Sequence, residues 1–226
     1  LFIPELIPDE DKIIYLDCDM IVRSSLAELY AMNHGDNYVL GVCDAYSRQE
    51  RKRMGVPRYI NAGMMLMNCK KMRDDAVYEK IADFIINHYD QIVMHDQDVV
   101  AAVFKGHIKY ISRKWNGLVL RLPAPKKYQQ INHANILHYV GKAKPWVPYS
   151  KSLMTEYYFE NLKLTPFAGF EKKYRWHRAL WHMMRLPANI CHLIYKKQTS
   201  RFRTFKTYNL LGITIHKRKS DPDRKN

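Results

Sequence analysis

The sequence predicts an α/β protein with a mixed sheet that helices cover on both faces. Three observations support this class. Short apolar, β-rich segments alternate with segments whose apolar residues have helical spacing. With 226 residues, 47% of them hydrophobic and only 9 glycines, the chain is large and apolar enough to bury a core. No internal repeat and no GxGxxG or Walker sequence is present, so no nucleotide-binding loop of those types is assigned.

The first elements can be assigned in order. Residues 13–16, Ile-Ile-Tyr-Leu, suit a buried central strand because they are apolar without interruption. A short helix is expected over residues 26–30, and residues 38–42 read as the next strand. Residues 47–58 are polar and carry five Lys or Arg residues, which indicates a mobile surface loop.

The pattern continues to the end of the predicted sheet. Residues 64–67 form an apolar strand, and residues 75–89 have apolar side chains at helical spacing. A second helix should start near Asp96. Further strands are expected over residues 108–111 and 135–139, which completes a mixed sheet between helices.

Charge divides the chain in two. Residues 151–226 hold 17 Lys or Arg and 5 Asp or Glu, a net charge of +12, whereas residues 1–150 have a net charge of +3. A domain boundary is therefore expected after the Pro-Trp-Val-Pro segment at residues 145–148. The predicted organisation is a folded domain over residues 1–150 and a basic aromatic tail over residues 151–226.

Three further features bound the interpretation. The four cysteines form no CxxC pair, which favours a reduced cytosolic compartment. No apolar run approaches the ~18 residues that a membrane-spanning helix requires. The chain begins at Leu1, without an initiator Met and close to a strand, so an N-terminally incomplete chain is expected and nothing follows about a signal peptide.

Asp17 and Asp19 are the first candidate functional residues. They follow the predicted strand at residues 13–16, and residues i and i+2 of a strand project to one side, about 7 Å apart. Ligands of open α/β sheets bind at such carboxyl strand ends. Two carboxylates there could hold Mg²⁺ or Mn²⁺, which in turn could hold a diphosphate. Two solvated acids in a turn explain the pair as well.

His138 ends another predicted strand and is followed by Gly141, Lys142 and Lys144. Glycine lets backbone N–H groups approach an anion, lysine supplies positive charge to phosphate, and histidine can complete an oxygen-rich coordination shell. The alternative is a surface turn anchored by a half-buried Trp146.

Two polar segments flank helices or strands. Asn61, Ala62 and Gly63 offer an amide and space for a ring, although a plain strand-entry turn explains them equally well. Asp96 and Gln97 could present polar atoms to sugar hydroxyls. From spacing alone, Asp96 is better read as a helix N-cap and Asp98 as a first-turn acid.

Taken together, these segments resemble glycosyltransferase family 8, and most closely its bacterial lipopolysaccharide galactosyl- and glucosyltransferases. The resemblance covers about residues 1–150. It rests on five motifs in the family's order, which are residues 14–22, Asn61-Ala62-Gly63, Asp96-Gln97-Asp98, Trp115-Asn116 and residues 138–146.

The resemblance implies a GT-A fold, a UDP-sugar donor, retention of anomeric configuration and Mn²⁺ or a similar ion such as Mg²⁺. It also implies residue roles: metal ligands Asp17, Asp19 and His138; diphosphate-binding Gly141 and Lys144; donor-site Asn61, Ala62, Gly63 and Cys18; Asp96 on the sugar and Gln97 at its anomeric carbon. The family's uridine-binding strands precede the matched segment, so these residues alone are expected to bind UDP-sugar weakly.

The resemblance also raises a question about mechanism. Retention normally indicates a carboxylate nucleophile, but the matching residue is Gln97, whose neutral amide is a poor nucleophile. The hypothesis is a front-face substitution, in which the acceptor attacks on the side that UDP leaves. The metal and Lys144 would stabilise the charge that grows on UDP.

In the tail, residues 170–186 project as a basic amphipathic helix, broken at Pro187. A second basic aromatic run covers residues 201–208. Such a segment can lie on an anionic membrane, where a lipid-linked acceptor would be found. The alternatives are a helix packed on the catalytic domain and, without any recognition motif, a nucleic-acid-binding surface.

The leading hypothesis is a metal-dependent, retaining hexosyltransferase that moves galactose or glucose from a UDP-sugar to a lipid-linked saccharide. It would lie in the cytoplasm, peripheral on the inner face of the membrane, and no nucleic-acid partner is expected. A catalytically inactive saccharide- or membrane-binding module is the alternative from another class.

Overall fold

The structure is a computed structural model that describes residues 1–119, 131–142, 144–147, 152–180, 183, 195–199, 205–210 and 213–218. The chain forms two compact units. The first comprises Leu1–Pro145 with Ser150–Tyr158, and the second comprises Trp146–Tyr149 with Phe159–Asn226. Each unit is described by itself.

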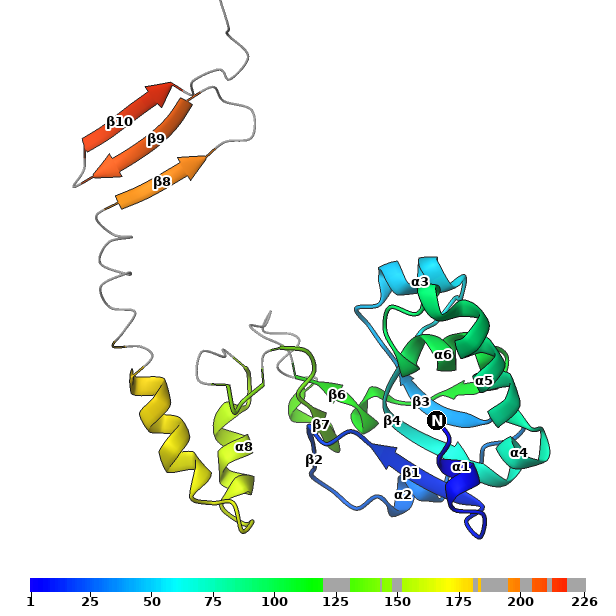
Figure 1. Ribbon diagram of the computed structural model, residues 1–226. Helices are drawn as coiled ribbons and strands as arrows, with labels where there is room; N and C mark the ends of the chain where they lie inside the picture. Colours follow the sequence, from blue (N-terminus) through cyan, green and yellow to red (C-terminus); the bar gives the residue numbers. More distant parts are fainter. Residues whose placement is uncertain are drawn as a thin grey trace, which may run out of the picture. The chain divides into compact units, whose positions relative to one another are not determined.

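A four-stranded mixed sheet is the centre of the first unit (Figure 1). Its order is β1-β4-β3-β5; β4 is antiparallel to β1 and to β3, and β5 is parallel to β3. The mixed α/β sheet predicted from the sequence is confirmed. The strands of this sheet are β1 (Lys12–Leu16), β3 (Val39–Cys43), β4 (Ile60–Asn68) and β5 (Ile108–Tyr110).

A smaller sheet, of order β2-β7-β6, lies beside the end of β1 (Figure 1). It consists of β2 (Met20–Val22), β6 (Gly117–Leu118) and β7 (Ile136–His138), with β2 antiparallel and β6 parallel to β7. The helical segments are α1 (Ile3–Leu6), α2 (Ala27–Tyr30), α3 (Arg48–Met54), α4 (Cys69–Asp74), α5 (Val77–His88), η1 (Tyr89–Gln91), α6 (Asp96–Val103), η2 (Arg113–Trp115) and α8 (Thr155–Leu162).

Apolar side chains cover both faces of the larger sheet. Met65 and Met67 of β4 belong to a core cluster that contains Ile81 of α5 and Val100 of α6. Met64 belongs to the cluster on the other face, with side chains from α2, η2 and β7. Each fully buried side chain of this size contributes about 1.5–3 kcal/mol, so the two clusters hold helices and both sheets together.

β1 was predicted to be a buried central strand, and in the described sheet it is an edge strand instead. It pairs only with β4 among the described strands, and all five of its residues are partly exposed. Its apolar run reflects packing on both faces of the sheet, because Ile13 faces the α4–α6 side and Ile14 faces the other. An uninterrupted apolar run therefore indicates that both faces of the strand pack against other elements, and it does not indicate how many strands pair with it.

A bulge in β4 places three residues of the predicted donor site. Gly41 of β3 pairs with Met65, but the next residue, Val42, pairs with Asn61, so residues 62–64 are extra on the β4 side. The strand begins at Ile60 rather than at residue 64, and the strand-entry turn considered for residues 61–63 is therefore wrong. The bulge carries Gly63 to the end of β1, where its carbonyl accepts a hydrogen bond from the Asp17 N–H at 2.8 Å.

The predicted loop over residues 47–58 is also wrong, because it contains α3. Arg53 of α3 donates to both oxygens of the buried Asp98 of α6, at 2.6 and 2.8 Å. Tyr59 donates to the same carboxylate, and so do the backbone N–H groups of residues 93 and 94. The polar, basic composition of this segment did not indicate a helix, because Asp98, which anchors α3, lies 45 residues after Arg53.

The second unit contains a helix and a small sheet. The helix covers residues 170–180, where Tyr174 is buried and packs on Phe159 with ring centroids 4.5 Å apart. Outside the described residues lie Trp181, His182, Met184, Arg185 and Leu186 of the predicted amphipathic segment, as well as Pro187, where the segment was predicted to break.

The strands β8 (Tyr195–Thr199), β9 (Phe205–Leu210) and β10 (Ile213–Arg218) form an antiparallel sheet that the sequence interpretation did not include. Residues 205–208 of the second basic run lie in β9, and residues 201–204 lie outside the described residues. Phe205, Thr207 and Tyr208 of β9 are aromatic or β-branched residues, which favour strands. Among the described residues, no helix is long and apolar enough to cross a membrane.

Candidate metal and donor site

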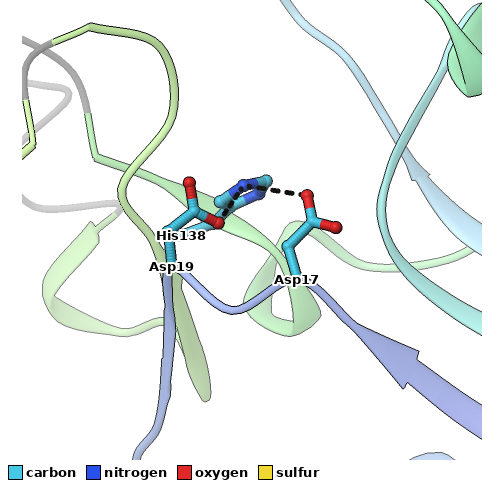
Figure 2. Close-up of side chains that lie close together, drawn as sticks. All are labelled: Asp17, Asp19 and His138. Carbon is cyan, nitrogen blue, oxygen red and sulfur yellow. Dashed lines mark ion pairs between the residues drawn. The ribbon is translucent and has the colours of Figure 1, made fainter.

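Asp17, Asp19 and His138 converge where the two sheets meet (Figure 2). Asp17 follows β1, Asp19 precedes β2, and His138 ends β7, where it pairs with Met20. Each residue offers one ligand atom, and the three atoms lie within 4.8 Å of one another. The imidazole Nε2 is 3.6 Å from Oδ2 of Asp17 and 3.2 Å from Oδ1 of Asp19.

The two aspartates do not share a strand, which corrects the geometry expected from their spacing. They occupy the link between β1 and β2, with the exposed Cys18 between them. Their carboxylates converge because β1 pairs with β4 while β2 pairs with β7. Cys18, Cys43 and Cys69 are free thiols. The role of Cys18 in donor binding stays a prediction.

Neighbouring side chains hold both carboxylates. The Tyr15 hydroxyl donates to Oδ1 of Asp17 at 2.8 Å; burial and then this bond raise the pKa of Tyr15 to about 12. Lys144 pairs with Asp19 and donates to the carbonyl of Tyr139 at 2.5 Å. Burial alone would raise the pKa of Asp19, but hydrogen bonds and charge from His138 and Lys144 outweigh it and lower the pKa to about 2. Asp19 is therefore anionic at neutral pH.

Gly63 leaves room for these groups. A Cβ atom on this residue would lie 2.7 Å from Oδ2 of Asp17 and closer still to Cε1 of His138. Two carboxylates and an imidazole that lie this close together match the donor set of Mn²⁺ or Mg²⁺. The residues therefore fit a divalent cation.

A buried polar network runs from Gln97 to His138. Gln97 Oε1 accepts from the Ala62 N–H at 3.3 Å and from Asn61 Nδ2 at 3.4 Å. Asn61 Oδ1 accepts from the Gly63 N–H at 3.2 Å and from Asn116 Nδ2 at 2.8 Å. Asn116 Oδ1 lies 3.0 Å from Nδ1 of His138. Residues predicted for the donor site and a candidate metal ligand are thus members of one hydrogen-bonded chain.

The sequence interpretation gave no role to Asn116, although it quoted the Trp115-Asn116 pair as a motif. Asn116 is 1% exposed. It follows η2, and only the pairing of β6 with β7 brings it to His138. An asparagine immediately after a buried tryptophan was the only signal, and it does not name a partner.

Asp96 is the first residue of α6, and the preceding His95 takes the N-cap position with a φ of 48°. The N-cap role expected for Asp96 is therefore wrong by one residue, while Asp98 is in the first turn as expected. Asp96 is exposed; desolvation and then the charge of Asp17 raise its pKa. Its role at the donor sugar stays a prediction.

Gly141 and Lys142 form an exposed turn after β7, and Gly141 has a φ of 69°. This conformation costs little only for glycine. Open space surrounds the position at which a Cβ would lie. The turn leads directly to Lys144 at Asp19, and the diphosphate-binding role of Gly141 and Lys144 stays a prediction.

The chain is similar in sequence to a known protein family and to several characterised proteins. A family model described as "Glycosyl transferase family 8" matches residues 1–148. General stress protein A of Bacillus subtilis (strain 168) is 30% identical over 180 residues, which are 72% of this chain and 63% of that protein. Lipopolysaccharide 1,2-glucosyltransferase of Escherichia coli is 24% identical over 205 residues, 83% of this chain and 58% of that protein.

A crystal structure of galactosyltransferase LgtC in complex with donor and acceptor sugar analogs is also similar. It has a TM-score of 0.60 and 30% identity, and the match covers 70% of this chain and 63% of that one. The predicted GT-A type sheet with flanking helices is confirmed. The chain spans less than two thirds of the length of each of these relatives.

Proposed function

The chain belongs to glycosyltransferase family 8, and from this membership we propose a metal-dependent, retaining hexosyltransferase. It would move galactose or glucose from a UDP-sugar to a lipid-linked saccharide, such as lipopolysaccharide. The convergence of Asp17, Asp19 and His138 at one point carries the proposal. The names of the similar glucosyl- and galactosyltransferases support the substrate class.

Asp17, Asp19 and His138 would hold Mn²⁺ or Mg²⁺. When bound, the ion would neutralise negative charge on the diphosphate of the donor. Lys144, at Asp19, would place its ammonium beside the leaving phosphate, and the Gly141 turn would bring backbone N–H groups toward the same anion. Cys18 would line the donor site between the two aspartates.

Asn61, Ala62, Gly63 and Asp96 would line the site for the donor sugar, with Gln97 near its anomeric carbon. Gln97 is 8% exposed, and its Oε1 already accepts two hydrogen bonds. A neutral oxygen held in this way is a poor nucleophile, which supports the front-face mechanism. A covalent sugar adduct trapped on Asp96 or another carboxylate would contradict it.

The experiment that tests the function is donor turnover by the chain and by an Asp19→Asn variant. Hydrolysis and transfer are measured with UDP-galactose and UDP-glucose in the presence of Mn²⁺, and Mn²⁺ binding is measured separately by calorimetry. We expect Asp19→Asn to abolish both activities and to weaken Mn²⁺ binding, because it removes an anionic ligand at neutral pH.

Asp9→Asn is the matched control, because Asp9 is an exposed acid outside the site. Its turnover should equal that of the unchanged chain. Turnover that persists in Asp19→Asn would contradict the metal-dependent mechanism. Donor or saccharide binding without any turnover by the unchanged chain would favour the catalytically inactive binding module.

We further propose that residues 151–226 associate with an anionic membrane surface, which would place the protein peripherally on the cytoplasmic face. The net charge of +12 supports this, as do large apolar side chains that are exposed in the second unit. These side chains are Leu164, Phe167, Phe170, Trp176 and Met183. Nucleic acid is not a proposed partner.

A further inference from the structure

The buried network between Gln97 and His138 has a direction. A backbone N–H can only donate a hydrogen bond, and the network contains two of them. The Ala62 N–H points to Gln97 Oε1, and the Gly63 N–H points to Asn61 Oδ1. These two bonds fix which end of each amide is the oxygen, because an amide NH₂ in either place would face a donor.

The direction passes on through Asn61 to Asn116. Since Asn61 Oδ1 accepts from Gly63, the group of Asn116 that lies 2.8 Å away must be the donor Nδ2. The other end of the Asn116 amide is then Oδ1, which lies 3.0 Å from Nδ1 of His138. An amide oxygen accepts only, so Nδ1 must carry a hydrogen.

We propose that Asn116 is a positioning residue that keeps the hydrogen of His138 on Nδ1, so that Nε2 is the nitrogen that offers its lone pair to the metal. The bulge in β4 supplies the two N–H groups that orient Asn116 through Asn61 and Gln97. This inference rests on the metal site of the proposed function and adds a residue that does not touch the ion.

Both the location and the burial of Asn116 support this role. Asn116 and His138 are 1% and 3% exposed, so water does not replace the bond between them. Nε2 faces Asp17 and Asp19, at 3.6 and 3.2 Å, on the side opposite to Asn116. A histidine ligand commonly donates its other ring N–H to an acceptor, and loss of that acceptor typically costs 10- to 100-fold in metal affinity.

The chain contains an internal control for the tautomer. His34 is buried, and its Nε2 lies 3.1 Å from the backbone carbonyl of Leu66. A carbonyl accepts only, so neutral His34 should carry its hydrogen on Nε2, the opposite nitrogen to His138. Neither Asn61 nor Asn116 contacts His34, and changes at these positions should leave its signals unchanged.

The test is long-range ¹H–¹⁵N correlation NMR of the full chain, without metal and with Mg²⁺, which is diamagnetic. In the unchanged chain we expect His138 to carry a hydrogen on Nδ1 in both states, and Mg²⁺ to perturb Nε2. We expect Asn116→Ala to lose this preference. Calorimetry should show its Mn²⁺ dissociation constant rising about 10- to 100-fold.

A pair of variants at Asn61 tests whether this residue orients the Asn116 amide, because neither His138 nor Asn116 is substituted. Asn61→Asp keeps an acceptor for Asn116 Nδ2 and should keep the hydrogen on Nδ1. Asn61→Leu is similar in size but lacks the acceptor, which frees the Asn116 amide to turn and should let the hydrogen move to Nε2. If Asn61 only filled space, His138 would have the same tautomer in both variants.

Specific outcomes overturn the inference. A His138 Nδ1 without hydrogen in the unchanged chain overturns it, and that spectrum needs no variant to fold. Asn116→Ala with the original tautomer and Mn²⁺ affinity also overturns it, as does the same tautomer in both Asn61 variants. Failure of the unchanged chain to bind Mn²⁺ would instead contradict the proposed function, while the absence of a hydrogen on Nδ1 in the metal-free chain would still overturn the role of Asn116.

Discussion

At Gly63, the lack of a side chain lets two candidate metal ligands approach the backbone. The Cβ of an alanine would occupy the space of the His138 ring and would lie 2.7 Å from Asp17 Oδ2. This geometry adds to the predicted place of Gly63 in the donor-sugar site, which stays a prediction. Gly63 shapes the candidate metal site, and its N–H also orients the amide network.

Gly63→Ala should therefore displace His138 or Asp17. We expect Mn²⁺ binding, measured by calorimetry, to weaken by about 10- to 100-fold or more. The matched control is Gly169→Ala, because open space surrounds the position of its Cβ and it lies in the other unit. An alanine at position 63 with unchanged affinity would show that the ligands can shift without loss.

At the scale of elements, α3 is held by one buried carboxylate. Asp98 is fully buried and accepts from Arg53, Tyr59 and two backbone N–H groups. Burial alone would raise the pKa of Asp98, but the bonds from Arg53 and the other donors lower it. The same carboxylate fixes the backbone just before α6, the helix that carries Asp96 and Gln97.

Removal of the guanidinium should destabilise this arrangement. Arg53→Ala is expected to lower the free energy of unfolding by about 3 kcal/mol, because a buried charge loses its counter-ion. Urea denaturation measures the change. Lys52→Ala is the matched control on the same helix, since Lys52 is exposed, and it should change stability by less than about 0.5 kcal/mol.

The same pair predicts a dependence on pH. A lowered pKa means that Asp98 contributes stability above the pKa that it has in the unfolded chain, and that this stability is lost as the pH falls through the lowered value. Without Arg53 the pKa of Asp98 should rise, so Arg53→Ala should lose stability at a higher pH than the unchanged chain. The free energy of unfolding of both proteins is measured from neutral to acidic pH. Loss of stability at the same pH in both proteins would contradict this prediction.

At the scale of the whole molecule, the chain separates a nearly neutral folded part from a basic one. In the second unit, Tyr174 points inward to Phe159, whereas Trp176 and Met183 are 63% and 58% exposed. Trp176 and Met183 are seven residues apart, a spacing that helical periodicity predicts to lie on one face. This face is the part of the second unit that the membrane proposal needs.

Replacement of Trp176 and Met183 together by serine should reduce flotation with anionic vesicles by about tenfold or more, because burial of each such side chain is worth about 1.5–3 kcal/mol. Neutral vesicles should bind less of the unchanged chain. The matched control replaces Tyr78 and Ile86 of α5, which are exposed apolar residues of the first unit. Equal flotation of both double variants would contradict a membrane role for the helix face.

The amino-acid sequence alone predicts the fold class, most strands and helices, and the identity of the three residues that converge at the candidate metal site. It could do so because periodicity and residue type are local properties. It also gave the charge of the tail. It misjudged residues 47–58, however, since the stability of α3 depends on an ion pair with Asp98, a contact that composition does not reveal.

The geometry of the site depends on contacts between distant parts of the chain. Asp17 and Asp19 meet His138 because they lie in the link between β1 and β2, and β1 pairs with β4 whereas β2 pairs with β7 of the other sheet. Gly63 and Asn116 reach the same point through a bulge in β4 and the pairing of β6 with β7. These relations join residues up to about 120 positions apart in the chain, and a polar residue gains its role there from its hydrogen-bond partner, which local sequence does not specify.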